Sequence, residues 1–183
     1  MDDIRVGIAL ELSTLHTLMG ADFIRQLKQI VARKEFIPVV GESGIYSVGG
    51  ETNEDYPNLI NAARKAVEHG YKVFLLPNPK DLRTADYIFE RKGVYKMFDL
   101  KTIVGKNSVG NRLSESIDQT NRVLLNLQTD YSIRRLTSDI RHYFEASTEA
   151  QEVLIFKTNK EISIKRNIAT SKGFLKMMMN SFR

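Results

Sequence analysis

The sequence predicts an α/β fold of the α+β type, in which a mixed β-sheet is flanked by helices. Two observations lead to this fold class. The 183 residues are 42% hydrophobic and 27% charged, so the chain can bury a proper core. Between residues 55 and 127 the pattern runs helix, three strands, helix, strand. We therefore expect residues 1–54 to form a helical and extended appendage, and residues 55–183 to form the main domain.

The appendage combines a helical pattern with a glycine-rich stretch. Apolar residues recur at intervals of three and four between residues 12 and 31, which predicts an amphipathic helix with a break near Gly20. The stretch "FIPVVGESGIYSVGGE" contains Pro38 and four glycines. It predicts extended pieces that are joined by glycine turns.

The main domain is expected to begin with a helix over residues 55–70. Asp55 suits the N-cap, Pro57 the first turn and Gly70 the position after the last turn. A buried strand, "YKVFLLP", follows and ends at proline. Beyond a central hairpin, the pattern predicts a short helix over 112–121, a buried strand over 122–127, an amphipathic helix over 132–147 with Ser132 as N-cap, a hairpin across Asn159-Lys160 and a weakly helical tail.

The central hairpin, "TADYIFERKGVYKMFDLKTI", carries the candidate chemistry. If Lys92-Gly93 is a two-residue loop, counting outward pairs Asp86 with Asp99. Directly opposite residues share a face, with Cβ atoms about 5 Å apart. Lys101 lies two residues beyond Asp99 and projects from the same face. The other face of the hairpin carries a plausible core, made of Tyr87, Phe89, Phe98 and Leu100.

Two carboxylates and an ammonium on one face are the parts needed to hydrolyse a phosphodiester. Magnesium takes hard oxygen ligands and is typically held by one or two carboxylates, waters and substrate phosphates. A lysine beside it stabilises negative charge on the reacting phosphate or orients the attacking water. A second interpretation stays open at this point, with Asp86 as a turn residue and Asp99 and Lys101 on a solvated strand face.

Charge and composition indicate which class of partner the protein binds and in which compartment it is found. The net charge of +5 and the pI of about 9.4 favour a polyanionic partner, nucleic acid before anionic membrane. The absence of cysteine excludes disulfides, thiolate catalysis and cysteine-based zinc sites. No apolar run approaches the ~20 residues of a membrane span, and "MDDIRVGIALEL" lacks a signal-peptide cleavage site. We expect a cytoplasmic protein without a membrane partner; the sequence does not predict its oligomeric state.

The hairpin and the segment after it also carry a family resemblance. "ADYIFE…KMFDLKT", followed by a helix with Gln119 and then "RVLLNL", resembles the PD-(D/E)xK nuclease superfamily. "GYKVFLLP…ADYIF…DLKTI…SVGNRLSESIDQTNRVLLNL" is similar to the tRNase toxin domains at the C-termini of contact-dependent growth inhibition proteins. Related domains occur in phage and mobile-element proteins. The resemblance covers residues 55 to about 127 and can be extended to residue 164.

The resemblance implies a restriction-endonuclease-like αβββαβ core and a metal site in the hairpin. Asp86, Asp99 and the backbone carbonyl of Leu100 would hold Mg²⁺ or Mn²⁺, and Lys101 would orient water or stabilise the transition state. Thr102 is a supporting residue by its place in the motif. The implied partners are nucleic acid, with RNA favoured over DNA, and a cognate immunity protein.

The resemblance also concerns polar residues in two helices, the one after the hairpin and the one before the first strand. A polar residue at the place of Gln119 often reaches back towards the catalytic site, although a solvent-facing glutamine is an equal alternative. Many relatives carry a further metal-binding glutamate in the helix before the first strand. The comparable turns of this chain hold Asn58 and Asn61, which can ligate through a carbonyl oxygen but carry no charge.

Several basic and polar residues are candidates for contacts with substrate phosphates. Lys106, Ser108 and Arg112 belong to the segment after the hairpin, which is otherwise a polar connector. Arg134 and Arg141 lie largely away from the apolar stripe of a later helix, a face that suits either phosphate binding or plain solvation.

The sequence thus predicts a metal-dependent nuclease, an RNase in the first place and a DNA endonuclease of the same fold as the alternative. A non-catalytic nucleic-acid-binding module, or an interaction module of a phage or mobile element, is the alternative outside the enzymes. The asparagines in the first helix favour the binding module.

Overall fold

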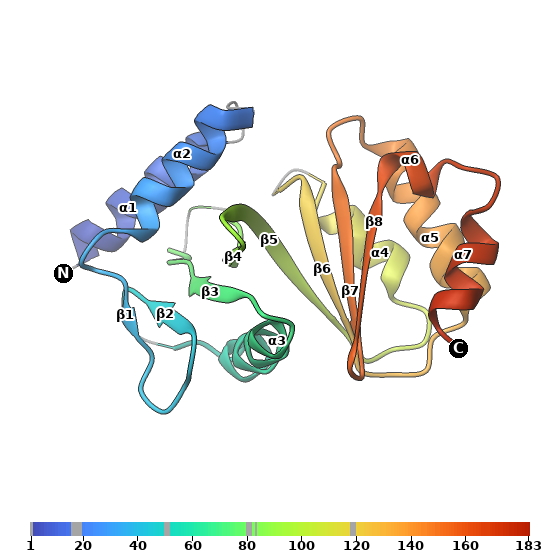
Figure 1. Ribbon diagram of the computed structural model, residues 1–183, viewed down its shortest axis with the longest axis horizontal. Coiled ribbons are helices and arrows are strands. Elements are labelled where there is room, and N and C mark those ends of the chain that lie inside the picture. Colours follow the sequence, from blue (N-terminus) through green and yellow to red (C-terminus); the bar gives the residue numbers. More distant parts are fainter. Residues whose placement is uncertain (1, 16–19, 50–51, 80–81, 83, 118–119) are drawn as a thin grey trace. The chain divides into compact units, whose positions relative to one another are not determined.

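A computed structural model describes residues 2–15, 20–49, 52–79, 82, 84–117 and 120–183 (Figure 1). Eight strands form a mixed sheet in the order β1-β2-β3-β4-β5-β6-β7-β8, which confirms the predicted fold class. The chain divides into two compact units, residues 1–99 and 100–183, and the division falls inside strand β5. The elements are α1 (Asp2–Thr14), α2 (Gly20–Val31), β1 (Ile37–Pro38), β2 (Ile45–Ser47), α3 (Tyr56–Glu68), β3 (Lys72–Leu75), β4 (Tyr87–Arg91), β5 (Val94–Ile103), α4 (Val109–Glu115), β6 (Arg122–Leu127), α5 (Ile133–Ala146), β7 (Glu152–Lys157), β8 (Lys160–Lys165), α6 (Arg166–Ala169) and α7 (Phe174–Ser181).

The predicted order of helix, three strands, helix and strand is confirmed by α3, β3, β4, β5, α4 and β6. The segment expected to be an appendage also contributes to the sheet of the first unit. Strand β2 pairs in parallel with β3, and β1 pairs antiparallel with β2. The boundary proposed between residues 54 and 55 stays a prediction.

The first unit buries both faces of its sheet. Helices α1 and α2 pack on one face, where Leu27 and Ile30 meet Phe74 and Ile88. Helix α3 contacts β2 and β3 on the other side. Asp55 precedes α3 and Pro57 lies in its first turn, as predicted, although the Asp55 side chain makes no capping bond.

The turn of the central hairpin is confirmed at Lys92-Gly93. Both residues have positive φ, 54° and 79°, as a type I′ hairpin turn requires. The ladder then runs from the pair Arg91 and Val94 to the pair Tyr87 and Phe98. Aromatic rings line one face of the hairpin as expected, because the Phe89 ring lies in tilted contact with Tyr87 and with Phe98, at 5.1 Å between centroids in both pairs.

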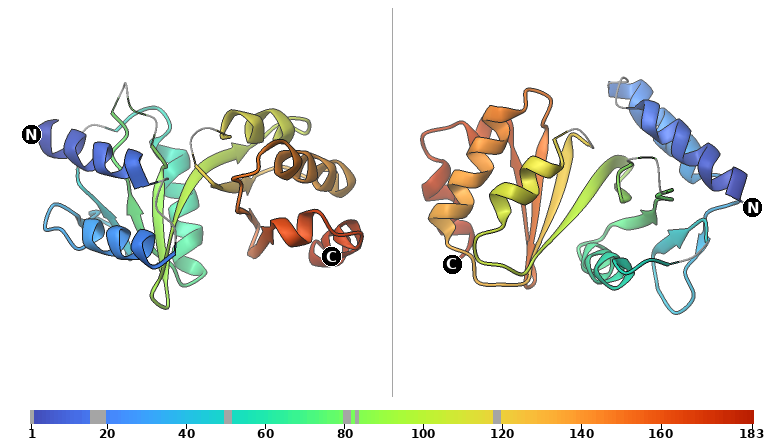
Figure 2. Two further views of the ribbon diagram at one scale, coloured as in Figure 1. Left: turned by 90° about the horizontal axis from the view of Figure 1, so that it is seen from above. Right: turned by 180° about the vertical axis from the view of Figure 1, so that it is seen from behind.

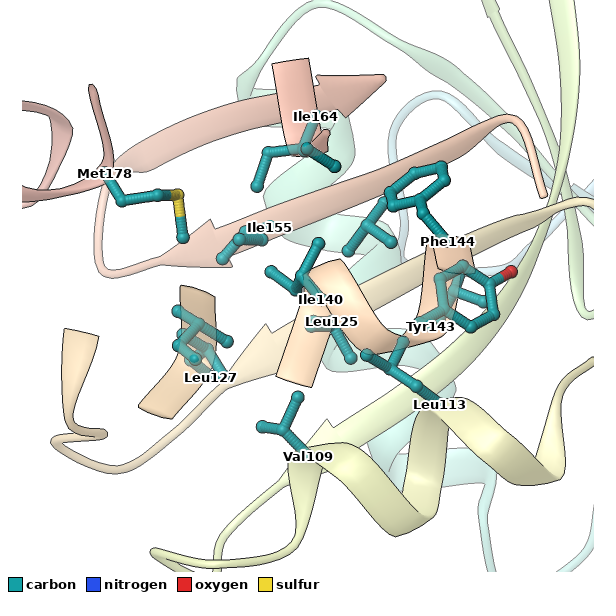
Figure 3. Packing of buried hydrophobic residues seen from close by; sticks show 14 of the residues in the cluster. Val109, Leu113, Leu125, Leu127, Ile140, Tyr143, Phe144, Ile155, Ile164 and Met178 are labelled. Atoms are coloured by element: carbon teal, nitrogen blue, oxygen red, sulfur yellow. The ribbon is translucent and has the colours of Figure 1, made fainter. Parts of the chain in front are cut away.

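The second unit has one continuous apolar core. Strand β6 pairs in parallel with β7, and β7 pairs antiparallel with β8. Helices α4 and α5 lie side by side in this unit (Figure 2). Their buried side chains meet those of β6, β7 and β8 in the core (Figure 3), which includes Leu113, Leu125, Ile140, Phe144, Ile155, Ile164 and Met178.

Two predicted boundaries in this unit were wrong. Helix α4 begins at Val109, three residues before the expected start, because Val109 and Leu113 lie one turn apart and both enter the core. The second hairpin turns at residues 158–159, since Lys157 pairs with Lys160. That register sets Val153 against Ile164 and Ile155 against Ile162, whereas the expected turn would have paired Val153 with a charged residue.

The remaining helical predictions agree with the structure. The N-terminal helical pattern is divided in two: α1 ends at Thr14 and α2 begins at Gly20, whose φ is 61°. Ser132 caps α5, and its side chain accepts a hydrogen bond from the Arg135 amide. Among the described residues, no helix has the length and apolar character needed to cross a membrane.

Candidate active site

Strand β5 places two charged side chains among apolar ones. Alternate residues of a strand share a face, so residues 95, 97, 99, 101 and 103 point the same way. Tyr95 and Met97 pack against the apolar cluster of the first unit, and Ile103 belongs to the core of the second. Asp99 and Lys101, on the same face of this strand, are only 4% and 7% exposed. Aspartate and lysine are rarely this buried unless they are paired or functional.

Asp86 lies just before β4, at a bulge. Its amide donates to the Phe98 carbonyl at 2.9 Å, while its own carbonyl accepts from the Leu76 amide at 2.9 Å. The ladder already pairs Phe98 with Tyr87, so Phe98 faces two successive residues. This is the arrangement of a β-bulge with Asp86 as the extra residue, and a bulge re-aims the side chain that it carries.

The bulge changes one detail of the predicted hairpin. Counting from the turn set Asp86 directly opposite Asp99, but the ladder ends at Tyr87 and Phe98. The physical reason is that the N–H and C=O of Asp86 bond to different neighbouring strands. A residue in a regular strand directs both groups to the same neighbour. The alternation of the strand therefore does not give the direction of the Asp86 side chain.

Tyr87 is a neighbour of both acids in the hairpin, because Asp86 precedes it and Asp99 follows its ladder partner Phe98. This tyrosine is fully buried, and its hydroxyl donates to the Leu59 carbonyl of α3 at 2.8 Å. Burial raises the pKa of Tyr87 well above its usual value, and the carboxylates of Asp86 and Asp99 raise that pKa further. Both acids therefore lie within electrostatic reach of one side chain.

The same hydroxyl anchors the helix turn that carries the asparagines. Leu59, whose carbonyl accepts the Tyr87 hydroxyl, lies in the first turn of α3 between Asn58 and Asn61. Asn58 is exposed and Asn61 is half-buried. The contact holds this turn of α3 next to strand β4. The resemblance implies a further metal ligand in this turn, and the residues present there, Asn58 and Asn61, carry neutral amides.

The donor set matches a hard divalent cation better than zinc. In the described part of the chain, no group of three or more His, Cys, Asp or Glu residues is arranged to hold a metal ion. Two carboxylates with carbonyl oxygens and waters are the ligands that magnesium typically takes. Asp86 and Asp99, with the Leu100 carbonyl, are thus the residues that could hold Mg²⁺ or Mn²⁺.

The supporting residues have different surroundings. Thr102 lies on the other face of β5 from Lys101, and its hydroxyl oxygen is buried without a hydrogen-bond partner in the described ranges. Gln119 lies outside the residues that the structure describes.

The predicted phosphate-binding residues fall into two groups. Lys106 and Arg134 are exposed. The others are used within the protein: Ser108 donates to the Gly105 carbonyl at 3.1 Å, and Arg112 lies 3.3 Å from Glu115. Arg141 donates to the carbonyls of residues 169 and 171 at 3.2 and 3.1 Å. Its guanidinium therefore ties α5 to the end of α6.

One contact that the sequence does not predict connects the loop after β5 to helix α5. The Arg135 guanidinium donates to the Asn107 side-chain oxygen at 2.7 Å. The two residues are 28 positions apart, and neither belongs to a motif, so no sequence pattern indicates the contact.

We expect Tyr87→Phe to lower the free energy of unfolding by about 1 kcal/mol, the typical net value of one hydrogen bond. The substitution keeps the ring packing and removes the bond to Leu59. Urea denaturation checks this result. Tyr95→Phe, at a partly exposed position of the same hairpin, is the matched control and should leave the midpoint nearly unchanged. Equal midpoints for Tyr87→Phe and wild type would show that the contact with α3 adds no stability.

Residues 83–162 match the family model of the contact-dependent growth inhibition CdiA C-terminal domain. The matched span includes Asp86, Asp99 and Lys101. Among solved structures, the chain is similar to the CdiA-CT/CdiI toxin and immunity complex from Burkholderia pseudomallei. The identity is 17% and the TM-score 0.45, and the alignment covers 70% of this chain and 92% of that chain. None of the curated proteins matches this chain.

Proposed function

We propose that the protein is a metal-dependent nuclease that hydrolyses phosphodiester bonds in RNA, with tRNA as the favoured substrate. The observation that carries this proposal is the burial of Asp99 and Lys101 on one face of β5, near which the bulge holds Asp86. The match of residues 83–162 to the CdiA C-terminal domain supports a toxin activity of this kind.

Each residue has a role in this proposal. Asp86 and Asp99 would hold the metal ion, with the Leu100 carbonyl as a further oxygen ligand. When bound there, the metal would supply Lewis acidity to the reaction. Lys101 offsets negative charge that develops on the reacting phosphate, an effect that is strong where water is excluded. Asn61 offers a neutral amide oxygen from α3.

The distribution of charge supports a polyanionic substrate. Residues 100–183 contain 14 Lys and Arg against 8 Asp and Glu, a net charge of +6. Residues 1–99 contain 13 against 14, a net charge of −1. The second unit thus carries the whole excess of positive charge, and phosphate neutralisation by such a surface dominates nucleic-acid affinity.

A second candidate is a nucleic-acid-binding module without catalysis. The neutral Asn58 and Asn61 favour it, because a metal site with one carboxylate fewer holds its ion more weakly. The resemblance to toxin domains and the family match also lead us to propose a cognate immunity protein as a partner.

Cleavage of purified substrates tests the proposal. The chain is incubated with tRNA and with duplex DNA in Mg²⁺, in Mn²⁺ and in EDTA, and the products are separated on denaturing gels. We expect RNA fragments that require the metal. DNA fragments alone would indicate the endonuclease, and retention of uncut RNA would indicate the binding module. If RNA is neither cut nor bound, the proposed function is wrong.

A further inference from the structure

The loop between β5 and α4, residues 104–108, is held at both of its ends and in its middle. Ser108 Oγ donates to the Gly105 carbonyl at 3.1 Å and closes the loop on itself. The Val109 amide donates to Tyr131 Oη at 3.3 Å. Asn107 Oδ1 accepts from the Arg135 guanidinium at 2.7 Å. One hydrogen bond within the loop and two to Tyr131 and Arg135 therefore hold this segment in place.

The bond between Asn107 and Arg135 joins two segments that together carry three cationic residues. Lys106 precedes Asn107 in the loop, and Arg134 precedes Arg135 in the first turn of α5. All three cationic side chains belong to exposed residues. The contact of 2.7 Å thus brings the loop that carries Lys106 to the helix turn that carries both arginines. We call Lys106, Arg134 and Arg135 the α5 basic cluster.

The carboxylate one turn along from Arg135 does not cancel this charge. Asp139 accepts a hydrogen bond from the Tyr131 hydroxyl at 3.0 Å. A Cβ added at Gly110 would lie 3.2 Å from Asp139 Oδ1, so this carboxylate is packed against α4. Three cations against Asp139 leave an excess of positive charge at the start of α5.

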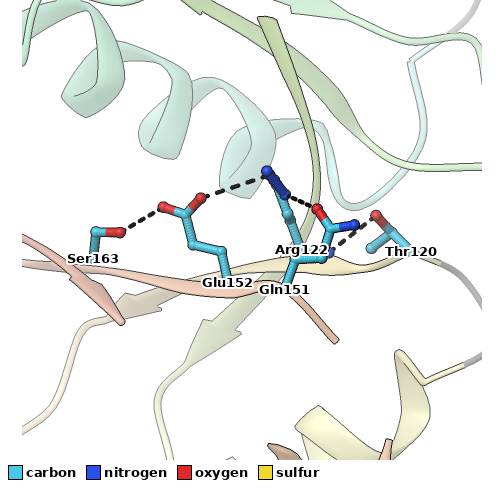
Figure 4. A network of polar contacts seen from close by, with 5 residues as sticks. All are labelled: Thr120, Arg122, Gln151, Glu152 and Ser163. Atoms are coloured by element: carbon cyan, nitrogen blue, oxygen red, sulfur yellow. Dashed lines mark hydrogen bonds and ion pairs between the residues drawn. The ribbon is translucent and has the colours of Figure 1, made fainter. Parts of the chain in front are cut away.

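Three other cations of the second unit, Arg166, Arg122 and Lys160, are bonded within the protein itself. Arg166 donates to three backbone carbonyls, those of Phe144, Ser147 and Ala150. Arg122 bonds to Gln151 and lies 3.6 Å from Glu152 (Figure 4). Lys160 donates to backbone carbonyls of α7 and of the residue that ends the chain. These side chains stabilise the fold, in contrast to the α5 basic cluster.

We propose that the α5 basic cluster binds the phosphate backbone of RNA and that Asn107 positions it by orienting the Arg135 guanidinium. The proposal rests on the proposed function for the identity of the ligand. Arginine has five N–H donors in a planar fork that matches phosphate geometry. The bond to Asn107 uses one of the two terminal nitrogens and fixes the plane of the fork, which lowers the entropic cost of binding.

Binding of the full chain to fluorescein-labelled tRNA in EDTA separates affinity from cleavage. The dissociation constant is measured by anisotropy over a range of salt concentrations. We expect Lys106→Ala and Arg134→Ala each to weaken binding by about three- to tenfold. Each should also make the negative slope of log K against log salt shallower by about 0.7–0.9, the value for one phosphate contact. Lys176→Ala, an exposed lysine of α7, makes the same charge change and should leave the slope nearly unaltered.

Two variants test the positioning role of Asn107. Asn107→Ala leaves the net charge unchanged and is expected to weaken RNA binding at least threefold. Arg135→Lys keeps the charge but loses the planar fork, so it should behave like Asn107→Ala and unlike wild type. Thermal denaturation confirms that each variant is folded.

The site assignment is overturned if Lys176→Ala weakens binding as much as Lys106→Ala, since net charge alone would then explain the effect. Wild-type affinity for Asn107→Ala would overturn the positioning role. In either case RNA cleavage by wild type would leave the proposed nuclease intact. A wild-type chain that neither binds nor cuts RNA overturns both proposals.

Discussion

Asp99→Asn is expected to reduce metal-dependent RNA cleavage by about a thousandfold or more. Asp99 is 4% exposed on the face of β5 that also carries Lys101. The substitution keeps the size of the side chain and removes the charge that would hold the metal. A thousandfold loss corresponds to about 4 kcal/mol of transition-state stabilisation, the size of the contribution that a bound metal ion makes. Lys101→Met should cost about a hundred- to a thousandfold, as removal of one electrostatic stabiliser does.

Two measurements and one control variant make this prediction specific. Initial rates are compared at saturating Mg²⁺, and Mn²⁺ affinity is measured by calorimetry as a readout that is independent of turnover. Glu90→Gln, an acid of the same hairpin near its turn, is the matched control and should retain wild-type cleavage. Cleavage by Asp99→Asn at the wild-type rate, with unchanged Mn²⁺ affinity, would rule out Asp99 as a metal ligand.

The largest effect on stability is expected for Glu152→Ala. Glu152 is 1% exposed, accepts a hydrogen bond from Ser163 at 2.7 Å and lies 3.6 Å from the Arg122 guanidinium (Figure 4). Burial lowers the pKa of Arg122, and the charge of Glu152 acts in the opposite direction. Removing the carboxylate leaves a largely buried guanidinium without its counter-charge, a change that typically costs 3–5 kcal/mol. Arg122 keeps Gln151 and some access to water, so we expect about 2–3 kcal/mol.

Urea denaturation of three variants checks this estimate. Ser163→Ala removes a single hydrogen bond to the same carboxylate and should cost about 1 kcal/mol. Replacing Glu152 and Arg122 together by apolar residues should cost less than Glu152→Ala alone, because no unpaired charge remains. A loss for Glu152→Ala no greater than for Ser163→Ala would mean that the ion pair adds little.

The hairpin shows how far the sequence predicts the candidate site. Local rules suffice for Lys92-Gly93, where turn chemistry sets the ladder, and for the shared face of Asp99 and Lys101, which follows from alternation. They fail at Asp86, whose amide bonds to Phe98 of β5 while its carbonyl accepts from Leu76, the residue after β3. Long-range pairing overrides a count along one chain segment.

The same distinction separates the other successes from the failures. Ser132 was identifiable as an N-cap because its partner, the Arg135 amide, lies three residues away. Strands β1 and β2 have two and three residues, too few to show a period, and are specified by their neighbours. Arg141 lies on the polar side of α5 in the pattern, yet its guanidinium is bonded to carbonyls of residues 169 and 171. No local pattern distinguishes such an arginine from one that binds substrate.

The turn at Lys92-Gly93 limits how this chain can vary during evolution. Lys92 and Gly93 both have positive φ, a conformation that asparagine and glycine adopt readily, so residues of these types are tolerated at the turn. The number of residues in the turn is more tightly restricted than their identity. An insertion that shifted the ladder by one residue would turn Asp99 and Lys101 to the face that now carries Phe98. The aromatic residues would turn to the face that now carries Asp99 and Lys101. Substitutions at this turn are tolerated, whereas a change in its length would exchange the charged and aromatic faces of β5.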